Sequence, residues 1–263
     1  MVLFLFLAHL GIGILLTLVF VSREAGVKFF RFNAGLAAAL IAVALAFRPA
    51  TAMGPAGLAA MVALVAAEAA TIIYWASVGR GLASIRRPLI WIGVGGGVAA
   101  LVGQAVASSP DHSLPMQVLT VASFLSSAAL LGGACTAMIL GHWYLIIPSM
   151  HVGHLQSIVK LHIASMVVRI AVVAAAVFVG IELWQPALGP SFRRYIFSVG
   201  GIFFWQRVLF GLAGPALLSY LTWETAKIRS TQSATGILYV DFFAVVVGEV
   251  LSKYLLLATR VPV

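Results

Sequence analysis

Cysteine is almost absent from this chain of 263 residues, which contains only Cys135. A single cysteine cannot close an intramolecular disulfide, form a CxxC pair or supply the thiolates of an iron–sulfur cluster. Charged residues are also scarce, at 9% of the chain, whereas soluble globular proteins have about 25%. We therefore expect no iron–sulfur cluster in this chain and no water-soluble fold.

Acidic residues are the rarer charged type, with 7 Asp and Glu against 16 Lys and Arg and a formal net charge of +9. A basic protein can be a nucleic-acid binder, but it then needs an exposed basic surface. Here the basic residues flank apolar runs, so they are expected at helix ends. We predict anionic lipid headgroups as their partners and no nucleic acid.

Apolar residues make up 62% of the sequence and occur in long runs. A helix of roughly 20 apolar residues can cross a bilayer because all its backbone polar groups are satisfied within the segment. The sequence therefore predicts an all-α, polytopic integral membrane helix bundle that forms a single domain, 1–263. About eight spans are expected, over 2–21, 33–48, 57–78, 88–108, 116–146, 156–183, 195–222 and 234–258.

Basic residues cluster after the first, third and seventh runs, and the positive-inside rule places those joins in the cytoplasm. Both termini then lie on the outer, non-cytoplasmic face. The first run has no basic residue before it and no small-residue cleavage site, which favours a true span over a removable signal peptide. We expect the plasma (inner) membrane of a bacterium. The clustered residues are Arg23, Lys28, Arg31, Arg80, Arg86, Arg87, Lys227 and Arg229.

Four of the six histidines lie in one run, GHWYLIIPSMHVGHLQSIVKLH, over residues 141–162. If the fifth and sixth spans form a hairpin, Pro148 breaks the first helix and Gly153 permits the reversal. His142 and His162 are then at similar depth and are expected to face each other. The other two histidines, His151 and His154, would lie at the mouth of the hairpin or serve only as loop residues.

Two imidazoles from neighbouring helices can provide the axial ligands of a b-type haem, hold a metal ion or hydrogen-bond to a quinone. His142 and His162 are the candidate pair, and small residues along the fifth span would leave room for a cofactor. His9, in the first span, could ligate a second cofactor. It could equally be a core residue that hydrogen-bonds between helices.

Ionisable residues within spans cost about 2.5 to 3.5 kcal/mol each and usually face the bundle interior. In the sixth span, His162, Ser165 and Arg169 share one helix face. Arg207 falls at a similar depth in the seventh span. These residues predict a polar stripe from the cytoplasmic end to the middle of the membrane.

The two intramembrane arginines need counter-charges. Glu249 has Lys253 one helical turn away, at a spacing that favours a local pair. Glu68, in the third span, is therefore the expected partner of an arginine. Glu68, Arg169 and Arg207 would line a quinone site or proton path, or would form a structural network of ion pairs that fixes helix register.

The leading hypothesis is a membrane subunit of a respiratory-type electron-transfer complex that exchanges electrons with quinone. A b-type haem between the fifth and sixth spans is one option. Almost no chain lies outside the spans, which suits an anchor working with other subunits better than a stand-alone enzyme.

Two alternatives stay open. A multi-spanning transporter or permease would use Glu68, Arg169, Arg207 and His162 to line a polar or proton pathway, and the helix-breaking pair 214–215 would favour it. A membrane metalloenzyme would use the histidine hairpin, but the sequence has no HExxH motif and no acidic residue between His142 and His162.

Overall fold

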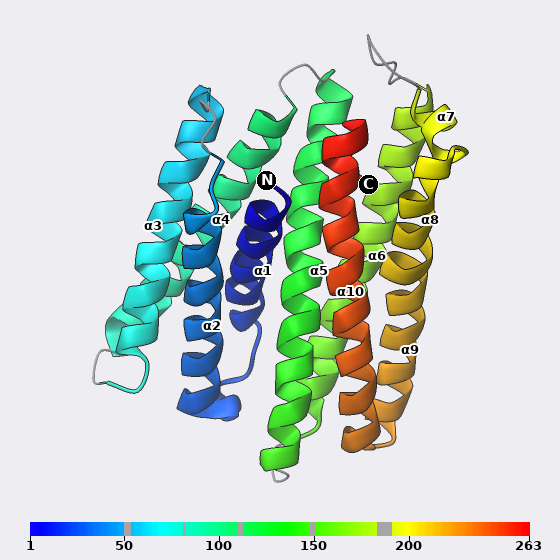
Figure 1. The fold of residues 1–263 in the computed structure, drawn as a ribbon. Coiled ribbons are helices and arrows are strands. Elements are labelled where there is room, and N and C mark those ends of the chain that lie inside the picture. Colours follow the sequence, from blue (N-terminus) through cyan, green and yellow to red (C-terminus); the bar gives the residue numbers. More distant parts are fainter. Residues whose placement is uncertain (50–53, 81–82, 110–112, 148–150, 183–190) are drawn as a thin grey trace.

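A computed structural model describes residues 1–49, 54–80, 83–109, 113–147, 151–182 and 191–263, and the regular elements in these ranges are all helical (Figure 1). The α-helices are α1 Val2–Leu18, α2 Gly26–Ala46, α3 Pro55–Ser77, α4 Ala83–Ser108, α5 Leu114–Ile146, α6 Gly153–Glu182, α7 Phe192–Ile196, α8 Ile202–Val208, α9 Gly214–Lys227 and α10 Thr231–Thr259. Short turns of other helix types are η1 Arg23–Ala25, η2 Val199–Gly201 and η3 Leu209–Ala213.

The prediction of an all-α membrane bundle is confirmed. Among the described residues, seven helical segments are long and apolar enough to cross a membrane, and one of them, Val199–Lys227, runs through η2, α8, η3 and α9. The remaining predicted span is α1, which has 17 residues. Its length is at the lower limit for a helix that crosses a bilayer.

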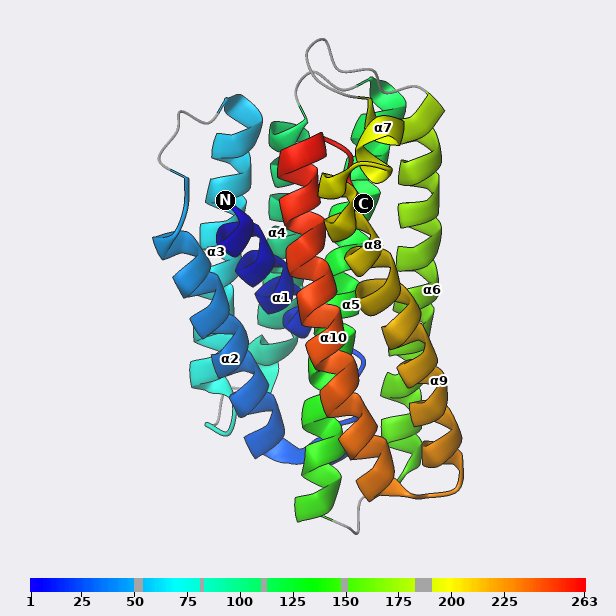
Figure 2. The same cartoon turned by 45° about the vertical axis from the view of Figure 1, so that its right-hand side comes forward.

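Helix α1 lies between two groups of helices (Figures 1 and 2). Helices α2, α3 and α4 form one group, and α5, α6, α8, α9 and α10 form the other, while α1 contacts α2, α4, α5 and α10. Thirteen of its residues are buried, on all sides of the helix. An apolar helix with no polar face belongs in the interior, and that is where it lies.

Both ends of the described chain lie toward the same end of the bundle (Figure 1). The turns that carry the basic clusters, between α1 and α2, between α3 and α4, and between α9 and α10, lie at the opposite end. This agrees with an even number of crossings. The assignment of that opposite end to the cytoplasm stays a prediction.

Helix α2 begins earlier than the predicted span, at Gly26 rather than residue 33. The extra turns are amphipathic, because Phe29 and Asn33 are buried while Lys28 is exposed. Gly26 has a φ of 81°, which glycine adopts without steric cost, and it separates α2 from η1. The apolar run alone could not reveal these turns, since they carry the charges of a helix end.

The seventh predicted span is helical from Val199 to Lys227 but is irregular within. A π-helical turn, η3, joins α8 to α9, and Pro215 follows it in the first turn of α9. Proline has no N–H to donate and disrupts the regular hydrogen-bond ladder. The helix-breaking pair Gly214 and Pro215 therefore coincides with a π-helical turn, and the segment does not end there.

Helices α1 and α5 touch backbone to backbone at Gly13 and Gly132. A Cβ added to Gly132 would overlap the carbonyl group of Gly13, and a Cβ on Gly13 would overlap that of Ala128. Backbone atoms cannot move aside as a flexible side chain can, so only glycine fits at this crossing.

Replacing Gly132 by alanine is expected to separate α1 from α5 and to lower the free energy of unfolding by about 1 to 3 kcal/mol, the usual cost of overpacking. Unfolding in mixed detergent micelles measures this loss. Gly95→Ala is the matched control, because no atom lies within 4 Å of its added Cβ. Equal stability of the two variants would contradict the close approach described above.

Candidate functional site

The largest group of buried ionisable side chains lies between α5, α6, α8 and α10. Helix α6 contributes Arg169, α8 contributes Arg207, and α10 contributes Glu249 and Lys253. These side chains are between 0% and 2% exposed, which is far below what charged residues normally show. We call these four residues the charge cluster.

The carboxylate of Glu249 is the centre of the charge cluster. Arg169 binds it with two nitrogens, Nε to Oε1 at 2.9 Å and Nη2 to Oε2 at 3.2 Å. Arg207 Nη2 donates to Oε1 at 2.7 Å, and Lys253 Nζ donates to Oε2 at 3.0 Å. One carboxylate thus joins three cations from α6, α8 and α10, with hydrogen bonds of the strong, charge-assisted kind.

Serine hydroxyls complete the shell around these ions. Ser127 on α5 donates to Glu249 Oε2 at 2.5 Å, and Lys253 donates to the same hydroxyl oxygen at 2.5 Å. Arg169 Nη1 binds Ser123 Oγ at 2.7 Å, and its Nη2 binds Ser252 Oγ at 2.8 Å. The shell leaves few donors without partners, as buried charges require.

Arg207 reaches Glu249 past two glycines. A Cβ on either Gly211 or Gly248 would lie 2.8 Å from Arg207 Nη1 and would meet the Cα of the other glycine. Arg207 Nη1 also donates to the carbonyl of Gly211 at 2.8 Å. Pro215 stands four residues after Gly211 and cannot donate to that carbonyl, so the helix interruption supplies the acceptor that Arg207 uses.

The charge cluster contains more positive than negative charge. When all are ionised, Arg169, Arg207 and Lys253 carry three positive charges and Glu249 one negative charge. Among the described residues no second carboxylate forms an ion pair with these cations. Charges in a medium of low polarity interact strongly, so this excess of positive charge attracts anions.

A second buried pair lies closer to the end with the basic clusters. His162 Nε2 and Asp241 Oδ2 are 2.7 Å apart, and both side chains are fully buried. His162 Nδ1 and Asp241 Oδ1 have no protein partner within the described ranges. Asp241 precedes Glu249 by eight residues, about 12 Å along α10, so the pair and the charge cluster form one polar column between α6 and α10.

The polar stripe predicted on α6 is present, since His162, Ser165 and Arg169 are all buried on the side of α6 that packs against α5. The side chains of Asp241 and Glu249 on α10 reach His162 and Arg169 there. The role of Asp241 and the central position of Glu249 were not predicted. An aspartate within the apolar run of α10 is the signal in the sequence that could have revealed this pair.

The structure does not bring His142 and His162 together. His142 is exposed and lies 3.2 Å from the hydroxyl of Tyr239, whereas His162 is buried against Asp241. Tyr239 and Asp241 are two residues apart on α10 and so point in different directions. Helix α10 packs on α5, and its side chains give each imidazole a separate partner, Tyr239 for His142 and Asp241 for His162.

The other three histidines in the described ranges also have protein partners. His154 Nε2 lies 2.7 Å from Glu24 Oε2 near the end of the bundle, and His151 accepts a hydrogen bond from the backbone of Gly153. His9 Nδ1 lies 3.1 Å from Ser127 Oγ, which extends the charge cluster into α1. His9 therefore has the interhelical hydrogen bond that was one of its two predicted roles.

Glu68 is not the partner of an arginine, which corrects the expectation from the sequence. It is buried on α3, and its Oε2 has no protein partner in the described part of the chain. Helix α3 packs on α2 and α4, whereas Arg169 and Arg207 lie in the other group of helices. Glu249 takes both arginines as well as the predicted Lys253, because a carboxylate can accept from several donors at once.

No group of three or more metal-binding side chains occurs within the described ranges. The turn predicted at Pro148 lies outside these ranges, because residues 148–150 are not described. Comparison of the chain with protein-family models, with curated proteins and with solved structures gave no match.

Glu249→Gln is expected to destabilise the protein by about 3 to 5 kcal/mol, because it removes the negative charge from among three buried cations. Unfolding in mixed micelles measures the change. The control Glu224→Gln breaks a half-exposed pair with Lys227 at 2.6 Å, and such pairs contribute only about 0 to 1 kcal/mol. A loss no greater than the control's would show that Glu249 does not hold the cluster together.

Proposed function

We propose that this chain is a multi-spanning transporter or permease in which the polar column between α6 and α10 is the pathway for protons or a polar solute. The observation that carries the proposal is the binding of three cations from three helices by Glu249, beside a π-helical turn. Of the electron-transfer, transporter and metalloenzyme hypotheses, an irregular helix beside buried ions favours the transporter most.

A merely structural role would not require buried ions. Apolar side chains of similar volume usually pack as well as a buried ion pair or better, and each charge adds a cost within a bilayer. An ion network does provide two states. Glu249 neutralises the cations in the present arrangement, and an incoming anion or water can replace it when α8 and α9 move about η3.

The pair His162 and Asp241 suits the entry of protons into this pathway. Its imidazole and carboxylate share one hydrogen bond, and each has a further polar atom that can bind water. From there the pathway leads past Ser165 to the charge cluster, about 12 Å along α10. Glu68, in the other group of helices, is proposed as a separate site of proton binding, because its Oε2 has no protein partner among the described residues.

The electron-transfer reading stays a prediction, together with its quinone, b-type haem and partner subunits. Axial ligation by His162 Nε2 would require Asp241 to release that nitrogen.

The supporting observations for membrane location are the spans and the basic residues at one end. We propose the plasma membrane of a bacterium, because proteins of the bacterial outer membrane are typically barrels.

The test measures access of water to the polar column. In a Cys135→Ala background, Ser165→Cys places a thiol between His162 and Arg169, and Val173→Cys places one on the same buried side of α6 among apolar residues. A charged methanethiosulfonate reagent should modify the first thiol about tenfold faster, because only a hydrated thiol ionises readily.

Equal rates at the two positions would mean that the column is dry, and the transporter proposal would fail. A reduced-minus-oxidised visible spectrum of the purified protein separates the other reading. Haem bands lost in both His142→Ala and His162→Ala would favour the electron-transfer subunit. A wet column without haem bands supports transport.

A further inference from the structure

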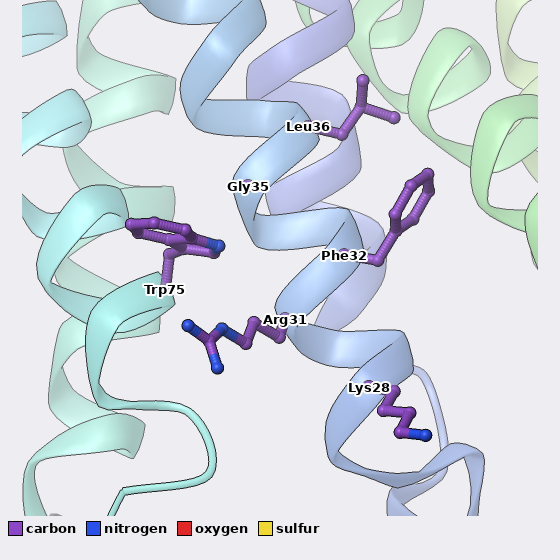
Figure 3. Close-up of a pocket in the computed structure, with 6 residues that line it drawn as sticks. All are labelled: Lys28, Arg31, Phe32, Gly35, Leu36 and Trp75. Carbon is purple, nitrogen blue, oxygen red and sulfur yellow. The ribbon is translucent and has the colours of Figure 1, made fainter.

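A surface hollow lies between α2 and α3, in the group of helices that does not contain the polar column. It has a volume of about 480 Å³ and is open at the surface (Figure 3). The residues that line it are Lys28, Arg31, Phe32, Gly35, Leu36 and Trp75. Five of them belong to α2, at positions 28, 31, 32, 35 and 36. Residues three and four positions apart are neighbours on a helix surface, so these five form one continuous face.

Gly35 creates the space in this hollow. The indole of Trp75 lies against Gly35, and a Cβ on Gly35 would be 2.9 Å from Trp75 Nε1. Arg31 extends from α2 toward the same indole, with its guanidinium carbon 5.6 Å from the ring centroid (Figure 3). The indole ring and the guanidinium thus place an apolar surface and a positive charge next to each other at the hollow.

The two positive charges at this hollow are not neutralised by the protein. Neither Lys28 nor Arg31 takes part in an ion pair in the described residues. The nearest acid in the sequence is Glu24, one turn before Lys28, and it binds His154 at 2.7 Å. The hollow therefore attracts an anion.

The hollow stands at the boundary between charged and apolar surface. Lys28 and Arg31 belong to the first turns of α2, and Trp75 to the last turn of α3. Farther along both helices the exposed residues are apolar, for example Val43 at 43% and Ile72 at 45%. Basic and aromatic residues in this order mark the interface between lipid headgroups and acyl chains.

We propose that this hollow is a binding site for one anionic phospholipid. Lys28 and Arg31 bind the phosphate of its headgroup, Trp75 and Phe32 flank the glycerol region, and an acyl chain follows the apolar surface beyond Leu36. The net negative charge of the lipid matches the two unpaired cations. This site does not depend on the proposed transport function.

The same end of the bundle offers a matched control. Lys160 and Lys227 lie 5.0 and 5.2 Å from the ring centroid of Trp223, which resembles the geometry of Arg31 and Trp75. There, however, Glu224 binds Lys227 at 2.6 Å. That site has basic and aromatic groups but carries its own counter-ion, so it should bind anionic lipid weakly.

The experiment measures lipid binding to the purified full chain by native mass spectrometry and by quenching of tryptophan fluorescence. Phosphatidylglycerol and phosphatidylcholine with brominated acyl chains are the probes, and the difference between the wild type and Trp75→Phe gives the signal of Trp75. Lys28→Gln combined with Arg31→Gln should weaken phosphatidylglycerol binding roughly 10- to 30-fold, as expected for two basic residues near an anionic headgroup.

Gly35→Val tests the shape of the site without changing its charge. It should displace lipid from Trp75 and reduce quenching by both brominated lipids. Lys160→Gln combined with Lys227→Gln should leave quenching of Trp75 unchanged. The proposal is overturned if the wild type does not prefer phosphatidylglycerol to phosphatidylcholine, or if the control pair weakens binding as much as Lys28→Gln with Arg31→Gln.

Discussion

The attraction between one buried carboxylate and three buried cations is the interaction on which the larger group of helices depends. Glu249 contacts side chains of α5, α6, α8 and α10, and through Ser127 it is linked to α1. In a medium of low polarity, these attractions are strong and the cost of leaving any of the ions alone is high. The relative positions of these helices are therefore fixed by charge as well as by packing.

Small residues make this arrangement possible. Gly211 and Gly248 let η3 and α10 approach closely beside the guanidinium of Arg207, while Pro215 leaves the carbonyl of Gly211 to that arginine. The planar guanidinium can serve both acceptors because its donors diverge. A lysine at position 207 has no such fork. The helix break and the arginine are thus two parts of one local structure.

The helical membrane fold was predictable because it depends on long apolar runs, which each segment carries by itself. The polar stripe on α6 followed from spacing within one helix for the same reason. The ion-pair partners of the two arginines could not be predicted from the sequence, because Glu68 and Glu249 are both plausible until the positions of the helices are known. The prediction that His142 and His162 face each other was wrong for the same reason. It assumed a simple hairpin of two helices and left out α10, which provides a separate partner for each histidine.

The central position of α1 bears on the order in which the protein is assembled. Helix α1 is synthesised before α4, α5 and α10, yet it acquires most of its surroundings from them. Helix α1 has 17 residues and contains the buried His9, whose exposure to lipid would cost free energy. The surroundings of α1 are therefore complete only when segments far along the chain, up to α10, are in place.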